Sequence, residues 1–206
     1  MSELAPTPIA AADWRALKAL LATVFDTLSD AGVITLMDAG TTQSDGFADC
    51  LELFHARGAD GAGLHGFVFF TKQDANRAKD SALLPIAFWG APDGSADNMM
   101  RVGTLLVRSL RDSNLAIQWD ESPSTRPTWE ITADDLKLAK DNKRAEQAAS
   151  RAVKREREMK VALEAAAELF AAKKYSAYIK KIKRFESILP PVHQKKLAFA
   201  RKRTAK

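Results

Sequence analysis

The sequence predicts a mixed α/β fold: a small, mostly parallel sheet of four to five strands with flanking helices, followed by a long basic helix and a C-terminal helical hairpin. Three observations lead to this expectation. In the first part of the chain, short apolar runs alternate with amphipathic stretches of helical period. All 10 glycines of the 206 residues lie between Gly32 and Gly103. The last part is rich in Ala, Lys, Arg and Glu and has no glycine, a composition that favours helix.

Charge divides the chain at the same place as composition. Residues 1–132 hold 10 Lys and Arg against 17 Asp and Glu, a net charge of −7. Residues 133–206 hold 21 against 9, a net charge of +12. We therefore expect an acidic α/β domain over 1–132 and a basic, all-helical extension over 133–206.

The elements of the first part follow from the spacing of its apolar residues. Recurrence at three- and four-residue steps predicts helices over 13–31, 47–57, 73–80 and 97–112. Short apolar runs predict buried strands over 33–37, 66–70, 83–88 and 115–119. Residues 128–131 alternate and predict a fifth strand, which returns as a hairpin and is antiparallel. Pro85 cannot donate to a ladder, so the third strand should be bulged or at an edge.

The second part reads as helix almost throughout. Residues 134–172 contain neither glycine nor proline, which predicts one long helix or two helices end to end. Residues 139–160 have few large apolar side chains, so this stretch should be solvated on most sides. An apolar stripe then continues to Leu189, where Pro190 and Pro191 end it. A last helix is expected over 193–203.

Polar residues follow the predicted strands at their carboxyl ends, where parallel α/β sheets gather ligands. If the strands are parallel, these residues share one candidate rim, which would suit a small ligand or a peptide: Asp38, Thr41, Thr42, Gln43, Ser44, Asp45, Gln73, Asp74, Trp119 and Asp120. The alternative is structural. Ser44 or Asp45 would cap one helix, Thr71 or Asp74 would cap the next, and the tryptophans would pack in the core.

Recognised catalytic and metal patterns are absent from the sequence. There is no glycine-rich phosphate loop, and Ser44 does not lie in a G-x-S-x-G elbow. The only cysteine, Cys50, shares an apolar helix face and is expected to be a buried structural thiol. Its spacing from His55 and His65 matches no zinc site. We therefore expect no metal and no cofactor, and the sequence leaves open whether the protein is an enzyme.

The basic extension carries the candidate partner-binding residues, which are Lys173, Lys180, Lys181, Arg184, Arg201 and Arg203. A protein partner is the leading expectation. Nucleic acid is a second possibility, because a cationic face can neutralise phosphates. The same charges also fit an ordinary solvated face, or a tail that docks on its own acidic domain.

The segments Ala39–Gly46 (AGTTQSDG), Gln73-Asp74 and Trp119-Asp120 resemble those of an uncharacterised bacterial α/β domain family, over about residues 32–131. That family has a glycine after the Trp-Asp pair, where Glu121 stands here. The resemblance implies the fold and no catalytic residue. Residues 163–203 loosely resemble a tetratricopeptide-type helix pair, a resemblance that implies protein binding.

The function expected from these features is that of a bacterial cytosolic binding or regulatory protein. One alternative is a hydrolase-like enzyme acting on small molecules through the rim carboxylates, and another is nonspecific nucleic-acid binding by the basic tail. No apolar run approaches the roughly 20 residues of a membrane-spanning helix. The first residues also lack the basic segment of a secretory signal, so we expect a cytoplasmic location and no membrane association.

Overall fold

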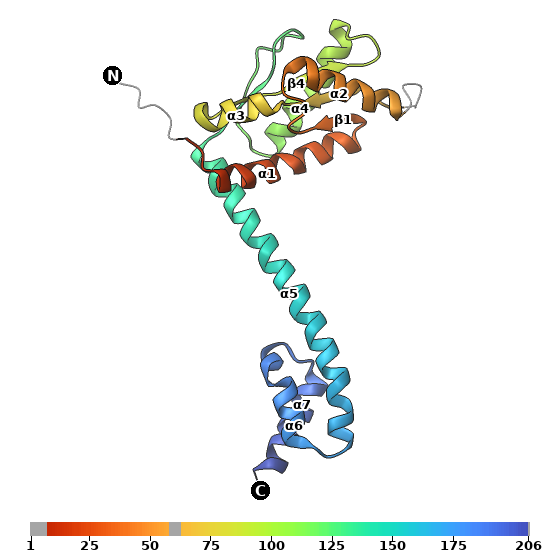
Figure 1. Cartoon of the computed structure of the whole chain (residues 1–206), viewed down its shortest axis with the longest axis vertical. Coiled ribbons are helices and arrows are strands. Elements are labelled where there is room, and N and C mark those ends of the chain that lie inside the picture. The colour runs from red at the N-terminus through yellow and green to blue at the C-terminus, as the bar shows by residue number, and fades with distance from the viewer. Residues whose placement is uncertain (1–7, 58–62, 206) are drawn as a thin grey trace, which may run out of the picture. The chain divides into compact units, whose positions relative to one another are not determined.

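The computed structural model describes residues 8–57 and 63–205, and the chain forms two compact units, Met1–Lys143 and Arg144–Lys206 (Figure 1). The first unit is mixed α/β, as predicted. Its helices are α1 (Ala11–Asp30), α2 (Gln43–Ala56), α3 (Lys72–Ser81), α4 (Ala96–Asp112) and the start of α5 (Ala133–Ala171). Its strands are β1 (Val33–Leu36), β2 (Gly66–Phe69), β3 (Leu83–Pro85), β4 (Ala87–Gly90), β5 (Ile117–Gln118) and β6 (Thr128–Glu130).

The prediction of one mostly parallel sheet is wrong. The strands form two three-stranded sheets, with the orders β1-β2-β4 and β3-β6-β5. Only β1 and β2 pair in parallel; β2–β4, β3–β6 and β5–β6 are antiparallel. The expected strand over 83–88 is divided between the two sheets, and Ile86 alone joins the parts. The expected edge position of Pro85 and the hairpin of the last two strands are confirmed.

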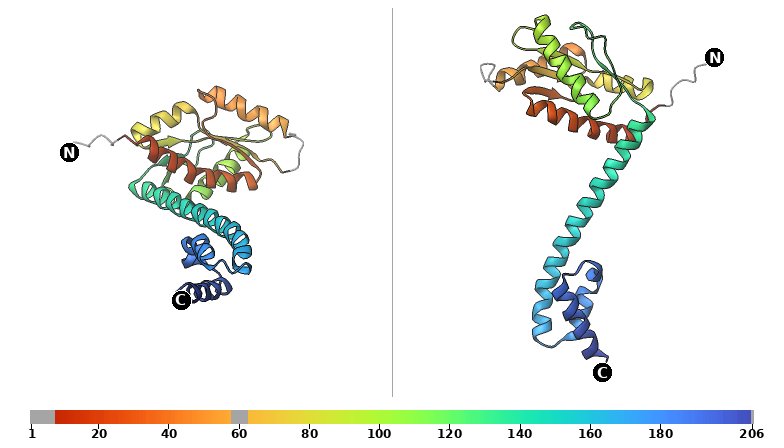
Figure 2. Two further views of the ribbon diagram at one scale, coloured as in Figure 1. Left: turned by 60° about the horizontal axis from the view of Figure 1, so that its bottom comes forward. Right: turned by 180° about the vertical axis from the view of Figure 1, so that it is seen from behind.

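The β1-β2-β4 sheet is buried on both faces, which explains its nearly continuous apolar runs. Side chains alternate along β2 and its next residue: Phe67 and Phe69 face α2, whereas Val68 and Phe70 face the other side. The helices α1 and α4 cover that second face, and Figure 2 shows α4, in light green, on the strands in the view from behind. The segment after β2 therefore begins at a strand that is covered on both faces.

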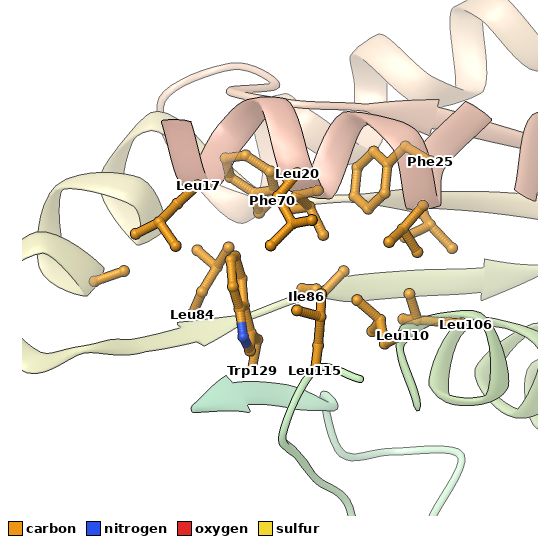
Figure 3. Close-up of a cluster of buried hydrophobic side chains, with 14 of the residues drawn as sticks. Leu17, Leu20, Phe25, Phe70, Leu84, Ile86, Leu106, Leu110, Leu115 and Trp129 are labelled. Atoms are coloured by element: carbon orange, nitrogen blue, oxygen red, sulfur yellow. The ribbon is translucent and has the colours of Figure 1, made fainter. Parts of the chain in front are cut away.

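The main core lies between α1, α4 and the extended stretch of β3 and β4 (Figure 3). Leu17 and Leu20 of α1 face Leu84, and Trp129 of β6 closes the cluster from the other side. The predicted α1 stripe is confirmed, because all its members are at most 6% exposed: Trp14, Leu17, Leu21, Val24 and Leu28.

The second unit contains the rest of α5, then α6 (Tyr175–Ile182), the 3-10 helix η1 (Lys183–Ile188) and α7 (Pro191–Thr204) (Figure 1). The long uninterrupted helix of the prediction is confirmed, and every residue over 141–158 is exposed. The apolar stripe buries Tyr178, Ile182, Phe185 and Leu189 against the last turns of α5 and against α7. The stripe ends at Leu189, before Pro190, as predicted. The last helix begins at Pro191 rather than at His193, because the missing N–H of a proline has no cost in the first turn.

Candidate functional site

Two of the expected rim segments meet because β1 and β2 are parallel. The backbone N–H of Ala39 donates to the carbonyl of Phe70 at 2.9 Å, and that of Lys72 donates to the carbonyl of Gly40 at 3.5 Å. The segments after β1 and after β2 therefore lie side by side at the carboxyl ends of these strands. These two parts of the candidate rim lie together at the carboxyl ends of β1 and β2, and we call this end of the sheet the edge.

The polar residues of this edge mainly start helices. The backbone N–H of Thr42 donates to Asp45 Oδ2 at 2.9 Å, and that of Asp45 donates back to Thr42 Oγ1. Thr71 and Asp74 form the same reciprocal pair at 3.0 Å in both directions. These are capping boxes, and each cap stabilises its helix by about 1 kcal/mol. The helix predicted over 47–57 begins earlier, at Gln43, so the loop between β1 and α2 is shorter than expected.

A third segment reaches this end of the sheet through an arginine that no sequence pattern indicates. Arg126, in the loop between β5 and β6, places Nη1 3.2 Å from Asp74 Oδ1. Asp74 is 5% exposed, so this ion pair is largely removed from water. The loop after β5 therefore contacts the start of α3, although the contact uses Arg126 rather than Trp119 or Asp120.

Trp119 and Asp120 make their contacts with other parts of the first unit, not with the starts of α2 and α3. The Trp119 ring lies edge-on to Phe88 at 5.9 Å, and its Nε1 donates to the carbonyl of Thr125. A Cβ on Gly103 of α4 would lie 2.8 Å from the Trp119 ring, so the ring packs tightly on α4. Asp120 accepts hydrogen bonds from Ser122 and Thr125 of its own loop.

Hydrogen bonds favour the charged form of two carboxylates of the candidate rim, Asp45 and Asp120. Hydrogen bonds from the Thr42 backbone and side chain lower the pKa of Asp45, and the Thr125 hydroxyl is the largest cause of the lowered pKa of Asp120. Asp38 pairs with Lys18 of α1. A general acid needs a pKa near the working pH, and the lowered pKa values of Asp45 and Asp120 lie further from it.

The remaining rim residues are exposed. Thr41, Gln43, Ser44 and Gln73 all lie at the surface. Gln43 and Ser44, with Phe47, line a shallow hollow of about 360 Å³. Cys50 is buried, as expected, and burial is the main cause that raises the pKa of its thiol to about 12. Within residues 8–57 and 63–205, no three His, Cys, Asp or Glu side chains are grouped so that they could hold a metal ion.

In the second unit, three of the candidate cations come together. Lys180, Lys181 and Arg184, with Ala177, line a hollow of about 390 Å³, which we call the basic hollow. The other candidates are placed differently. Lys173 lies in the turn between α5 and α6, with a φ of 57°. Arg201 makes two hydrogen bonds of 2.7 Å to Glu186, and the Arg203 guanidinium lies over the Phe199 ring.

The same unit has an aromatic surface that was not predicted from the sequence. The rings of Phe170, Tyr175, Tyr178 and Phe199 contact one another, although they come from three helices. Phe199 is 42% exposed. One signal was available in the sequence: Lys196, Phe199 and Arg203 stand at i, i+3 and i+7, which places them on one face of a helix.

The stability of the second unit should depend on pH through His193. Its Nδ1 is buried without a hydrogen-bond partner among the described residues, and burial, followed by the charge of Lys196, lowers its pKa from the usual 6.5. The unfolded chain therefore takes up a proton that the folded chain resists. The neutral form of His193 is the one that the folded unit accommodates. The free energy of unfolding is therefore fully retained above pH 6.5 and should fall as the pH drops below this value.

This expectation can be measured by thermal unfolding of the full chain, followed by circular dichroism from about pH 8 to about pH 5. The variant His193→Gln should remove part of the fall in melting temperature over this range. The matched control is His55→Gln, which changes an exposed histidine of α2 in the first unit. An unchanged pH profile in His193→Gln would contradict the assignment.

Comparison with known proteins identifies one family. A family model described as a domain of unknown function, DUF6891, matches residues 12–132, which is more than half of the chain. Comparisons with curated proteins and with solved structures find no match. In the part of the chain that the structure describes, no helix combines the length and the apolarity needed to cross a membrane.

Proposed function

The chain belongs to the DUF6891 family, a domain of unknown function, and from this premise we propose that it is a binding protein whose second unit takes up a polyanionic partner. The basic hollow on α6 and η1 is the proposed contact site. The observation that carries the proposal is the convergence of Lys180, Lys181 and Arg184 around one hollow whose lining contains no carboxylate.

The charge of the second unit supports the same conclusion. Residues 144–206 hold 18 Lys and Arg against 6 Asp and Glu, a net charge of +12, whereas residues 1–143 carry −7. An excess of one sign in so small a unit creates a potential that attracts oppositely charged molecules and speeds their association. The positive charge is therefore concentrated in one unit rather than spread over the chain.

The cations of the basic hollow are available for a partner. Lys180, Lys181 and Arg184 are all exposed. The Arg184 guanidinium lies 3.9 Å from the Glu158 carboxylate, and both side chains of this pair are largely solvated. Exposed pairs of this kind contribute about 0 to 1 kcal/mol, so a polyanion can displace Glu158 at little cost.

A larger hollow in the same unit adds apolar surface. It measures about 550 Å³, and it is lined by Ala148, Arg151, Ala152, Arg155, Glu156, Met159 and Ile188. Arg155 also donates to the carbonyl of Arg184, which connects this hollow with the basic hollow. Mixed apolar and basic surface of this kind is typical of interfaces that bind macromolecules.

The enzyme alternative has less support in the geometry. It depended on rim carboxylates that exchange protons, but Asp45 and Asp74 cap helices and Asp38 pairs with Lys18. The first unit then supplies a stable scaffold with an exposed polar edge. We therefore place the proposed function on the second unit.

The test is binding of fluorescently labelled heparin to the full chain at low salt. The double variant Lys180→Glu/Lys181→Glu should bind roughly tenfold more weakly, the factor produced by about 1.4 kcal/mol of lost attraction. The control Lys72→Glu/Lys137→Glu makes the same change in net charge at two exposed lysines of the first unit. Equal losses in both variants would show a nonspecific effect of net charge and would refute the proposed site.

A further inference from the structure

An aromatic surface with attached cations lies in the second unit, apart from the lining of the basic hollow. Phe170 lies in the last turn of α5, Tyr175 begins α6 and Phe199 belongs to α7. The Phe170 and Tyr175 centroids are 5.6 Å apart, and the Tyr175 and Phe199 centroids are 5.8 Å apart. All three rings retain solvent exposure, and Phe199 is 42% exposed. Three helices thus supply one continuous aromatic surface.

Two cations border these rings. Lys196 Nζ lies 5.5 Å from the Phe170 centroid, and the Arg203 guanidinium carbon lies 5.3 Å from the Phe199 centroid. Both distances allow a cation–π interaction, which fixes each charge beside a ring. We call Phe170, Tyr175, Lys196, Phe199 and Arg203 the aromatic–cation face.

We propose that the aromatic–cation face binds single-stranded nucleic acid, an inference that rests on the proposed polyanion binding and names the partner. Proteins that bind single strands combine aromatic rings, on which bases stack, with cations that follow the backbone phosphates. This face offers both within one unit of net charge +12. The phosphates on either side of a stacked base would meet Lys196 and Arg203.

Other polyanions would interact with the cations of the aromatic–cation face but would not stack on its rings. In a duplex the bases are already stacked on one another, so the exposed Phe199 ring gains no new stacking partner. An acidic polypeptide can pair with Lys196 and Arg203, yet it offers no flat π surface of the kind that each base presents. Because stacking tolerates every base, we expect little sequence preference.

The experiment compares four labelled probes of similar charge with the full chain: a dT oligonucleotide, an rU oligonucleotide, a DNA duplex and poly-glutamate. We expect both single strands to bind more tightly than the duplex and poly-glutamate. Phe199→Ala should weaken single-strand binding roughly tenfold, which is within the range for loss of one stacking ring. It should leave poly-glutamate binding unchanged.

The matched control is Val192→Ala, which truncates another exposed apolar side chain of α7, at 61% exposure. This variant should bind all four probes as the unchanged chain does. Phe199→Tyr keeps a ring and should restore single-strand binding. Arg203→Gln serves as a second variant if Phe199→Ala fails to fold, and it should reduce the salt dependence of single-strand binding by about one phosphate contact.

The outcomes separate this inference from the proposed function. Equal binding of single strands and duplex, with no effect of Phe199→Ala, would overturn the inference and leave polyanion binding in place. Tighter binding of poly-glutamate would overturn it in favour of an acidic protein partner. Absence of binding to every probe at low salt would overturn both.

Discussion

Replacing Trp129 with alanine should lower the free energy of unfolding by about 3–5 kcal/mol. Trp129 is 1% exposed and lies in the main core, on β6, which is the central strand between β3 and β5. Its truncation removes the largest fully buried side chain and leaves a cavity. It also removes the indole N–H that donates to Asp135 Oδ2 at 3.2 Å, and Asp135 is itself 3% exposed.

Urea unfolding of the full chain, followed by circular dichroism, measures this loss. The matched control is Trp119→Ala, which truncates the same residue type at a partly exposed position of the same core. We expect a clearly smaller loss there, because less apolar surface returns to water. Similar midpoints for the two variants would contradict the central place of Trp129.

The Gly66→Ala substitution in β2 should be strongly destabilising. Gly66 has a φ of 144°, and a Cβ there would lie 2.0 Å from the Trp89 carbonyl oxygen. That carbonyl belongs to the backbone of β4, which pairs with β2, so it cannot turn away as a side chain could. The substitution therefore requires the two strands to separate, and we expect a loss of more than about 3 kcal/mol.

Gly63→Ala is the control that isolates backbone strain. Gly63 has a φ of 107°, yet no described atom lies within 4 Å of the position of its Cβ. This variant should lose only the cost of an unfavourable backbone conformation, about 1–3 kcal/mol. If Gly66→Ala and Gly63→Ala unfold at the same denaturant concentration, the contact with Trp89 has no role.

The sequence predicts the elements of this protein well because periodicity reports burial, which is local to each helix or strand. It does not predict the sheets, because strand partners depend on where each connection returns the chain. Helix α3 carries the chain about 15 Å away from the end of β2, and β3 brings it about 10 Å back. The chain thus starts β4 beside Phe69, where β2 ended, and the pairing becomes antiparallel.

The contacts of the candidate rim also divide into local ones, which the sequence indicates, and long-range ones, which it does not. The T-x-x-D spacings of Thr42–Asp45 and Thr71–Asp74 are local, and capping was one of the two interpretations the sequence allowed. The contact of Arg126 with Asp74 spans 52 positions, so no periodic pattern in the sequence indicates it. The aromatic–cation face was missed for a related reason, since Phe199 of α7 lies far along the chain from Phe170 and Tyr175.

The single-residue junction at Ile86 has a consequence for how the first unit opens. Ile86 is fully buried, and its N–H donates to the Pro127 carbonyl at 2.8 Å, so the junction has no slack to absorb movement of either sheet. Opening of the strand pairs in one sheet should therefore also displace the strands of the other sheet. Amide hydrogens in β2 and in β6 should therefore exchange with deuterium through the same opening event, at one shared free energy.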